Sequence, residues 1–276
     1  MSRGQTPDSD LLIIGHRGAS ADAPENTFVA FDMAVRDGAD GIEFDVRLAR
    51  DGVPVVIHDA SLARTVQVEG RLVKEFDSTL LSKFYAGEWF NLCYPERASD
   101  SFLRQPIPTL AQVFERFGAL HLYVEMKCEE PSLQASLARA VVELTRAHGL
   151  ADRVVVKSFA LDSLREVKRL APEIRTAALF GRSWPRPLVP ASKIIAEAAR
   201  CGANEISLHH SLLRSATVEA AHQRGFDVLV WSVTGRVWLR RALALNLRAV
   251  ITDHPGWMHN VLGTLRALDA DRHETG

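Results

Sequence analysis

Acidic and histidine side chains lie close together in one short segment of the sequence, GIEFDVRLARDGVPVVIHD at residues 41–59. Glu43 and Asp45 are two residues apart in a run that is otherwise mostly apolar, and His58 follows a second apolar run. Residues two apart in a β-strand point to the same face, so these two carboxylates share one face. Carboxylates beside a histidine can bind a hard cation and transfer protons.

The two runs of this segment are joined around Asp51 and Gly52, a dipeptide typical of a tight β-hairpin. A hairpin symmetric about the bond between these two residues pairs Asp45 with His58. Directly opposed residues of an antiparallel pair point to the same face. We therefore expect Glu43, Asp45 and His58 to converge on one small volume.

Other predicted strands also end in polar side chains. The sequence GHRG ends the first strand with His16 and Arg17, and YVEMK ends a later strand with Glu125 and Lys127. With Glu43 and Asp45, Glu125 would complete a cluster of three carboxylates whose mutual repulsion raises their own pKa values. A divalent cation is the simplest compensation, and an all-carboxylate set suits Mg²⁺ or Ca²⁺.

The remaining polar side chains of this set fit two further tasks. His16 and His58 are candidates for proton transfer, and the sequence leaves open which of them is the acid and which the base. Arg17 and Lys127 are candidates for binding an anion such as phosphate.

Short β-rich runs alternate with amphipathic segments of helical length along most of the chain. The strands are predicted at 11–16, 39–46, 120–126, 153–159, 175–180, 204–208, 227–233 and 248–253, with the hairpin partner at 53–57. The helices are predicted at about 27–37, 132–148, 161–170, 191–201, 214–224 and 236–245. Eight strand–helix units favour a (β/α)₈ TIM barrel, whose chemistry lies at the C-terminal ends of its strands.

The rhythm is interrupted after the hairpin of the second strand, at about residues 60–106. This stretch is too long for a simple connection and carries five aromatic residues, Phe84, Tyr85, Trp89, Phe90 and Phe102. We expect a single barrel domain over residues 1–276, with this insert over one end of the barrel.

Composition restricts the class of protein. The 276 residues carry a formal net charge of −1 and are 47% hydrophobic, so a large core is expected and a basic nucleic-acid-binding face is not. The three scattered cysteines form no Cys-x-x-Cys pair, which indicates reduced thiols. No secretory signal or membrane span is evident, so we expect a cytoplasmic protein without stable membrane insertion. The oligomeric state is left open.

The N-terminal motifs together resemble those of the glycerophosphodiester phosphodiesterases. They are HRG, PENT, E-x-D, the DG hairpin and the HD pair, all within residues 16–59. The resemblance continues in order through IPTL, VEMK, KSF, VWSV and ITDHP, and so covers nearly the whole chain. It implies a (β/α)₈ barrel with an insert after the HD pair.

The resemblance also implies roles for individual residues. The divalent-metal ligands of the family match Glu43, Asp45 and Glu125, and its acid/base histidines match His16 and His58. Its phosphate-binding groups match Arg17 and Lys127, and an aromatic residue commonly near the glycerol moiety matches Trp231. The reaction implied is hydrolysis of a small-molecule glycerophosphodiester to glycerol 3-phosphate and an alcohol, through attack by the substrate's own hydroxyl.

Two rival functions stay open at this point. One is a lysophospholipase D-type phosphodiesterase, for which the aromatic residues of the insert would form an apolar mouth. The other is a non-catalytic barrel that binds phosphorylated ligands, although such a protein would have no evident need for both histidines.

Several polar residues have simpler interpretations than catalysis. Asn26 and Thr27 precede a predicted helix and are most simply N-caps. Asp253 is expected to close the barrel through hydrogen bonds, and His209 and His210 are expected to be structural. Trp231 could also belong to the core.

Overall fold

Eight parallel strands close into a barrel in the computed structural model. The structure describes residues 11–181 and 189–274, and from residue 268 onward it describes the backbone only. The closure is made by β1, which pairs with β2 on one side and with β9 on the other. The parallel strands are β1 (Leu12–His16), β2 (Gly41–Leu48), β4 (His121–Met126), β5 (Val154–Ser158), β6 (Arg175–Phe180), β7 (Glu205–His209), β8 (Asp227–Trp231) and β9 (Ala249–Thr252). The predicted (β/α)₈ barrel is confirmed.

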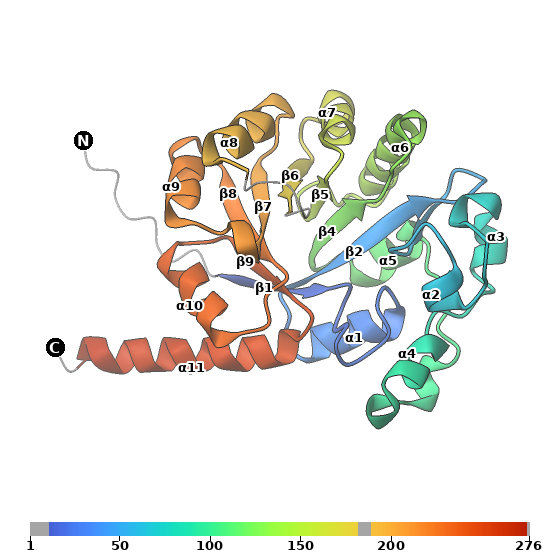
Figure 1. The fold of residues 1–276 in the computed structure, drawn as a ribbon, viewed down its shortest axis with the longest axis horizontal. Helices are drawn as coiled ribbons and strands as arrows, with labels where there is room; N and C mark the ends of the chain where they lie inside the picture. Colours follow the sequence, from blue (N-terminus) through green and yellow to red (C-terminus); the bar gives the residue numbers. More distant parts are fainter. Residues whose placement is uncertain (1–10, 182–188, 275–276) are drawn as a thin grey trace.

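Helices surround the barrel, as Figure 1 shows. They are α1 (Phe28–Arg36), α5 (Leu110–Phe117), α6 (Pro131–Ala147), α7 (Leu161–Leu170), α8 (Ala191–Arg200), α9 (Ser215–Gln223), α10 (Arg236–Ala244) and α11 (Pro255–Glu274). Their apolar faces and the outward side chains of the strands form the main core. Within the described residues, no helix is long and apolar enough to span a membrane.

The two ends of the barrel differ in chemistry. An apolar layer that includes Leu12, Tyr123, Val155 and Leu229 fills the interior. Toward the N-terminal ends of the strands, Glu205 accepts hydrogen bonds from Tyr123 and from Arg175, which closes that end with a paired polar network. The candidate catalytic groups lie at the opposite end, because His16 and Glu125 belong to the last residues of their strands.

The register of the hairpin is shifted by one residue from the predicted one. β3 (Pro54–Val56) pairs with β2 so that Val46 opposes Val56, and Asp45 therefore comes opposite Ile57 rather than His58. The backbone N–H of Gly52 donates to Ala49, and Gly52 has a φ of +80°. The loop thus holds three residues with a left-handed glycine, a common alternative to the two-residue turn.

The insert is ordered and has small cores of its own. The chain leaves the barrel after β3 and returns where the N–H of Val56 donates to Pro108. Between these points it forms α2 (Ala63–Val66), α3 (Ser78–Leu81), α4 (Glu88–Cys93) and the 3₁₀ turns Val73–Glu75, Pro95–Arg97 and Asp100–Phe102. These elements lie beyond the C-terminal end of β2 (Figure 1).

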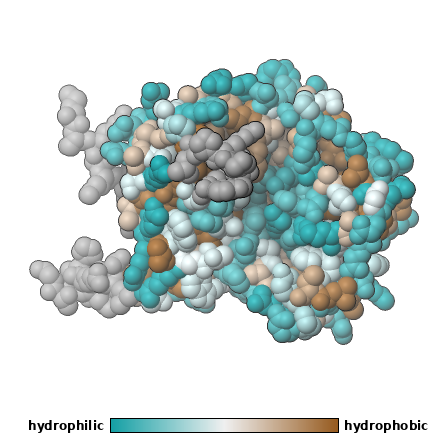
Figure 2. Space-filling view, in the orientation of Figure 1, coloured by the Kyte–Doolittle hydropathy of each residue, from teal (hydrophilic) through white to brown (hydrophobic). Residues whose placement is uncertain are grey.

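The aromatic residues of the insert are divided between its cores and its surface. Phe90 and Phe102 are buried against Ala23 and Ala30, and Phe84 packs against a second cluster around Leu62. The exposed surface is largely hydrophilic in Figure 2, with a hydrophobic patch over α4, where Leu92 is 68% exposed.

Candidate active site

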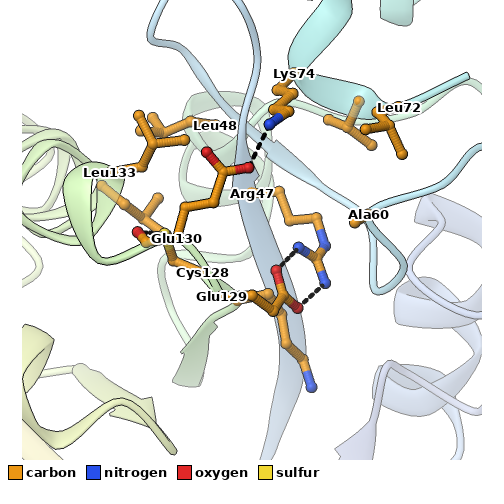
Figure 3. A pocket seen from close by; sticks show the side chains of 12 residues that line it. Arg47, Leu48, Ala60, Leu72, Lys74, Cys128, Glu129, Glu130 and Leu133 are labelled. Carbon is orange, nitrogen blue, oxygen red and sulfur yellow. Dashed lines mark hydrogen bonds and ion pairs between the residues drawn. The ribbon is translucent and has the colours of Figure 1, made fainter.

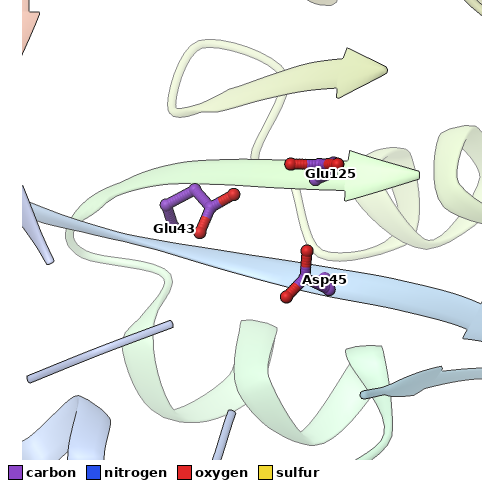
Figure 4. A group of neighbouring side chains, drawn as sticks. All are labelled: Glu43, Asp45 and Glu125. Carbon is purple, nitrogen blue, oxygen red and sulfur yellow. The ribbon is translucent and has the colours of Figure 1, made fainter. Parts of the chain in front are cut away.

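Three buried carboxylates meet at the C-terminal end of the barrel. Strand pairing sets Glu43 of β2 beside His16 of β1, and Asp45 of β2 beside Glu125 of β4. Glu43, Asp45 and Glu125 each offer an oxygen within 4.8 Å of the others, and Figure 4 shows these side chains turned toward one another. The predicted convergence of the three carboxylates is confirmed.

The oxygens of this acidic triad fit a hard cation. Oδ1 of Asp45 and Oε1 of Glu125 are buried and accept no hydrogen bond among the described residues. Lys127 Nζ lies 3.3 Å from the Asp45 oxygen and 2.5 Å from the Glu125 oxygen, as an ion-pair partner of both. Buried carboxylate oxygens whose charge is met, within the described ranges, only by the Lys127 ammonium are a suitable donor set for Mg²⁺ or Ca²⁺.

The carboxylates of the triad differ in their pKa values. Burial opposes ionisation of all three, yet the charges of Arg17 and Lys127 bring the pKa of Asp45 well below its usual range. The charge of Lys157 overcomes burial at Glu43 and lowers its pKa. Burial prevails at Glu125 and raises its pKa. Without a cation, burial and the charge of Asp45 therefore make Glu125 harder to ionise than Glu43 or Asp45.

The two ring nitrogens of His16 have different neighbours: one faces the triad, and the other faces an aspartate. Its Nε2 lies 3.9 Å from Oε2 of Glu43, and its Nδ1 lies 2.5 Å from Oδ1 of Asp253. Burial alone would lower the pKa of His16, but the hydrogen bond to Asp253 and the charge of Glu43 raise it. Asp253 also accepts a hydrogen bond from Ser20. It therefore orients His16, beyond the barrel-closing role expected from the sequence.

The ring of His58 is likewise paired with an aspartate. Its Nδ1 lies 2.6 Å from Oδ1 of Asp59, and Asp59 accepts a further hydrogen bond from Arg64. Burial opposes the ionisation of Asp59, but the bonds from Arg64 and His58 lower its pKa to about 2. The charge of His58 contributes to the lowered pKa of Asp45, so the two groups interact despite the shifted hairpin register.

A strained loop ties Arg17 to the triad. Arg17 and Asn26 both have positive φ values, 54° and 58°, and the N–H of Asn26 donates to the carbonyl of Arg17. The Arg17 guanidinium lies 3.1 Å from Asp45 and 2.9 Å from Glu25. Left-handed conformations of non-glycine residues are costly and concentrate at functional sites.

Asn26 has a different role from the predicted helix cap. Its side-chain amide donates to Oδ2 of Asp45, and its side-chain oxygen accepts from the Asp45 N–H. Thr27 is the N-cap of α1, with its hydroxyl accepting from Ala30. The two residues therefore have different roles: Asn26 holds the Asp45 carboxylate, and Thr27 caps the N-terminus of α1.

Trp231 lies at the C-terminal end of β8 with two aromatic neighbours. Its ring centroid is 5.7 Å from that of Phe159 and 5.1 Å from that of His209. The Trp231 side chain also packs on the apolar layer inside the barrel. Both predicted interpretations of this residue, core packing and a place at the rim, are compatible with this position.

A cavity of about 530 Å³ opens beside His16. Its wall combines the loop after β1, the end of β9 and the insert, which contributes Arg64, Trp89, Tyr94 and Arg97. Arg64 lies 5.5 Å from the Trp89 ring centroid, and Arg97 lies 5.9 Å from that of Tyr94. The insert therefore lines this cavity with cations stacked on aromatic rings.

A second cavity, of about 70 Å³, has Arg47, Lys74, Glu129 and Glu130 in its lining (Figure 3). Arg47 makes two parallel hydrogen bonds to Glu129 there, and Lys74 pairs with Glu130. The Cys128 thiol donates to the carbonyl of Glu130. The first pair links β2, and the second the insert, to the segment between β4 and α6.

Four side chains of the site were not predicted from the sequence: Asn26, Asp59, Lys157 and Asp253 contact its carboxylates or histidines. Asp59 is the second residue of the HD pair, and Asp253 lies within the ITDHP motif. Lys157 follows an apolar run near the end of its strand, as Lys127 does. This position is the sequence signal that could have identified Lys157 as a site residue.

Comparison with known proteins places these features in context. The profile of the glycerophosphoryl diester phosphodiesterase family matches residues 16–257. A glycerophosphodiester phosphodiesterase of Caldanaerobacter subterraneus is 32% identical over 258 residues, which cover 91% of this chain and 97% of that protein.

Solved structures show the same architecture. An Oleispira antarctica phosphodiesterase in complex with the product sn-glycerol-3-phosphate is 26% identical, with a TM-score of 0.79 over 91% of this chain and 96% of that one. A glycerophosphodiester phosphodiesterase of Agrobacterium tumefaciens is 28% identical, with a TM-score of 0.73 over 90% and 99% of the two chains.

Proposed function

This chain belongs to the glycerophosphoryl diester phosphodiesterase family, and from that premise we propose that it hydrolyses glycerophosphodiesters to glycerol 3-phosphate and an alcohol. One observation carries the proposal for this chain: the buried acidic triad is flanked by two histidines, each paired at Nδ1 with an aspartate.

The cationic side chains hold the phosphodiester. Lys127 and Arg17 both pair with Asp45, and their side chains are 15% and 18% exposed. Both can therefore reach the phosphate oxygens from the solvent side. A divalent cation held by Glu43, Asp45 and Glu125 would add Lewis-acid stabilisation of the charge that develops on phosphorus oxygens. Mg²⁺ and Ca²⁺ both suit this oxygen donor set.

The histidines transfer protons at Nε2. Their Nδ1 atoms are occupied by Asp253 and Asp59, which fix the rings and leave Nε2 for the substrate. In the first step one histidine takes the proton of the substrate's glycerol hydroxyl as that oxygen bonds to phosphorus. The other histidine gives a proton to the departing alcohol oxygen, and a cyclic phosphate remains. Water then opens the ring with the two roles exchanged, which restores both histidines.

The cavity beside His16 holds the leaving alcohol in this proposal. It adjoins the proton-transfer group, and Arg64 and Arg97 already lie near the Trp89 and Tyr94 rings. Guanidinium groups donate hydrogen bonds to hydroxyl and anionic oxygens, and they repel a quaternary ammonium group. The cavity therefore favours hydroxyl-rich alcohols such as glycerol or inositol over choline.

The two rival functions are less well supported. A lysophospholipid would need an apolar mouth, but Phe90 and Phe102 of the insert are buried, 0% and 4% exposed, and charged residues line the cavity. A binding protein would need a cationic phosphate site, but not two histidine–aspartate pairs.

A substrate panel tests the proposal. Purified protein with Mg²⁺ or Ca²⁺ is assayed on glycerophosphoinositol, glycerophosphoglycerol, glycerophosphocholine and a lysophospholipid. Release of glycerol 3-phosphate from the water-soluble diesters supports the proposal. Preferential release of lysophosphatidic acid from the lysophospholipid would favour the first rival, and binding of glycerol phosphate without turnover would favour the second.

A further inference from the structure

Lys157 is a fully buried lysine inside the barrel. It lies on β5 directly beside Glu125 in the strand register, and it is 1% exposed. Burying an ammonium group is unfavourable unless it is paired and hydrogen-bonded, so its partners determine why it is tolerated here.

The partners of Lys157 are two members of the acidic triad. Its Nζ lies 2.8 Å from Oε1 of Glu43 and 3.5 Å from Oε2 of Glu125. The second oxygens of both carboxylates point elsewhere: Oε2 of Glu43 accepts from the Arg17 N–H, and Oε1 of Glu125 lies near Lys127. Lys157 thus approaches the triad from inside the barrel and leaves its outer oxygens for other groups.

Position separates Lys157 from the other cations of the site. The side chains of Arg17 and Lys127 are partly exposed, whereas that of Lys157 is 2% exposed. A phosphate can therefore contact Arg17 and Lys127 but not Lys157. The three carboxylates with this one inner ammonium carry a formal charge of −2, and Arg17 and Lys127 pair with Asp45 and Glu125 as the more exposed cations.

We propose that Lys157 is the built-in counter-ion of the acidic triad, which pairs with Oε1 of Glu43 and Oε2 of Glu125 from inside the barrel and stabilises the triad when no cation is bound. The inference rests on the metal site of the proposed function, but it concerns a residue that does not touch substrate. Because the ammonium also repels the cation, it keeps the affinity for the ion lower than three bare carboxylates would give.

The test compares Lys157→Met, which keeps most of the side-chain volume and removes the charge, with the wild-type protein. Tm is measured in EDTA and with Mg²⁺ or Ca²⁺, and the Kd of each ion is measured by calorimetry. In EDTA we expect Lys157→Met to lower Tm. We expect its cation-induced rise in Tm to exceed the wild-type rise and its Kd to be at least roughly tenfold lower, since the inner ammonium no longer repels the ion.

A matched control separates charge from packing. Val155→Ala removes apolar volume from the same strand, facing the apolar layer inside the barrel. It should lower Tm in EDTA and with the ion by similar amounts, and it should leave the Kd unchanged. If Lys157→Met behaves like Val155→Ala in both respects, Lys157 is a packing residue and the proposal fails.

The double variant Glu43→Gln/Lys157→Met covers the case in which the single variant does not fold. Removing the partner charge together with Lys157 should recover stability in EDTA relative to Lys157→Met alone. A double variant that is no more stable than the single one would overturn the counter-ion role. This comparison in EDTA also holds if the wild-type protein binds no divalent ion, a result that would instead refute the metal site of the proposed function.

Discussion

The Nδ1 atom of His16 lies 2.5 Å from Oδ1 of Asp253, a residue 237 positions later in the chain. Closure of the barrel makes this contact, because β1 and β9 are neighbours although they begin and end the series of strands. His58 forms the equivalent pair with the adjacent Asp59. The two histidines are thus each paired with an aspartate, and these aspartates come from different parts of the sequence.

Asp253→Asn should identify the role of His16. The hydrogen bond to Asp253 and the charge of Glu43 raise the pKa of His16 against the effect of burial, so the substitution should lower that pKa. The limb of the pH–rate profile that His16 governs should then move to lower pH. A shift of the acidic limb makes His16 the base of the rate-limiting step, and a shift of the alkaline limb makes it the acid. Asp32→Asn, at a surface ion pair with Arg116, is the control. Unchanged limbs in Asp253→Asn would contradict the coupling.

His16→Ala and His58→Ala should each reduce kcat by about a thousandfold or more, because each removes one proton-transfer group of the proposed reaction. Far-UV circular dichroism and Tm should stay near those of the wild-type protein. His222→Ala, on the exposed face of α9, should have full activity. Wild-type rates in either His16→Ala or His58→Ala would remove that residue from the mechanism.

Asn26→Ala should weaken divalent-ion binding and activity by about 10- to 100-fold, the usual effect of losing a residue that orients a metal ligand. Both side-chain groups of Asn26 hold Asp45. Calorimetry measures the Kd of the ion, and kcat/KM is measured at saturating ion. Asn91→Ala, which loses hydrogen bonds to Ser99 within the insert, should change stability without changing the Kd. Equal Kd values for Asn26→Ala and the wild-type protein would show that Asp45 needs no such support.

Arg97→Gln should reduce the preference for hydroxyl-rich leaving alcohols. The measured quantity is the ratio of kcat/KM for glycerophosphoinositol to that for glycerophosphocholine, which we expect to exceed one in the wild-type protein. Removing a cation from the wall of the cavity should lower this ratio several-fold, mainly through KM. Arg36→Gln, on the exposed side of α1, is the matched control. A wild-type preference for the choline ester would refute the proposed cavity chemistry.

The strands and their order were predictable because the period of two, the turn residues and the alternation with helical segments are local signals. The acidic triad was predictable as well, since strand ends of a parallel barrel meet at one edge. The hairpin register was not: Asp51 and Gly52 favour both two-residue and three-residue loops, and the choice depends on the backbone of Gly52 in the folded hairpin.

Partners formed by tertiary contact were harder to predict than motif residues. Asp253 meets His16 only through barrel closure, and Asn26 turns to Asp45 because both Arg17 and Asn26 adopt positive φ values. The position of Asn26 before α1 favours a cap by ordinary propensity, and the tertiary hydrogen bonds to Asp45 override it. Lys157 could be placed on a strand, but its burial between Glu43 and Glu125 follows from side-chain packing inside the barrel.

Release of glycerol 3-phosphate from glycerophosphoglycerol tests the central claim most directly. The assay compares wild-type protein with added Mg²⁺ or Ca²⁺, the same protein in EDTA, and Glu43→Gln with the ion. The account predicts rapid release for the first, loss of activity in EDTA that is restored by the ion, and little activity for Glu43→Gln. Full activity in EDTA, or no release under any of these conditions, would contradict it.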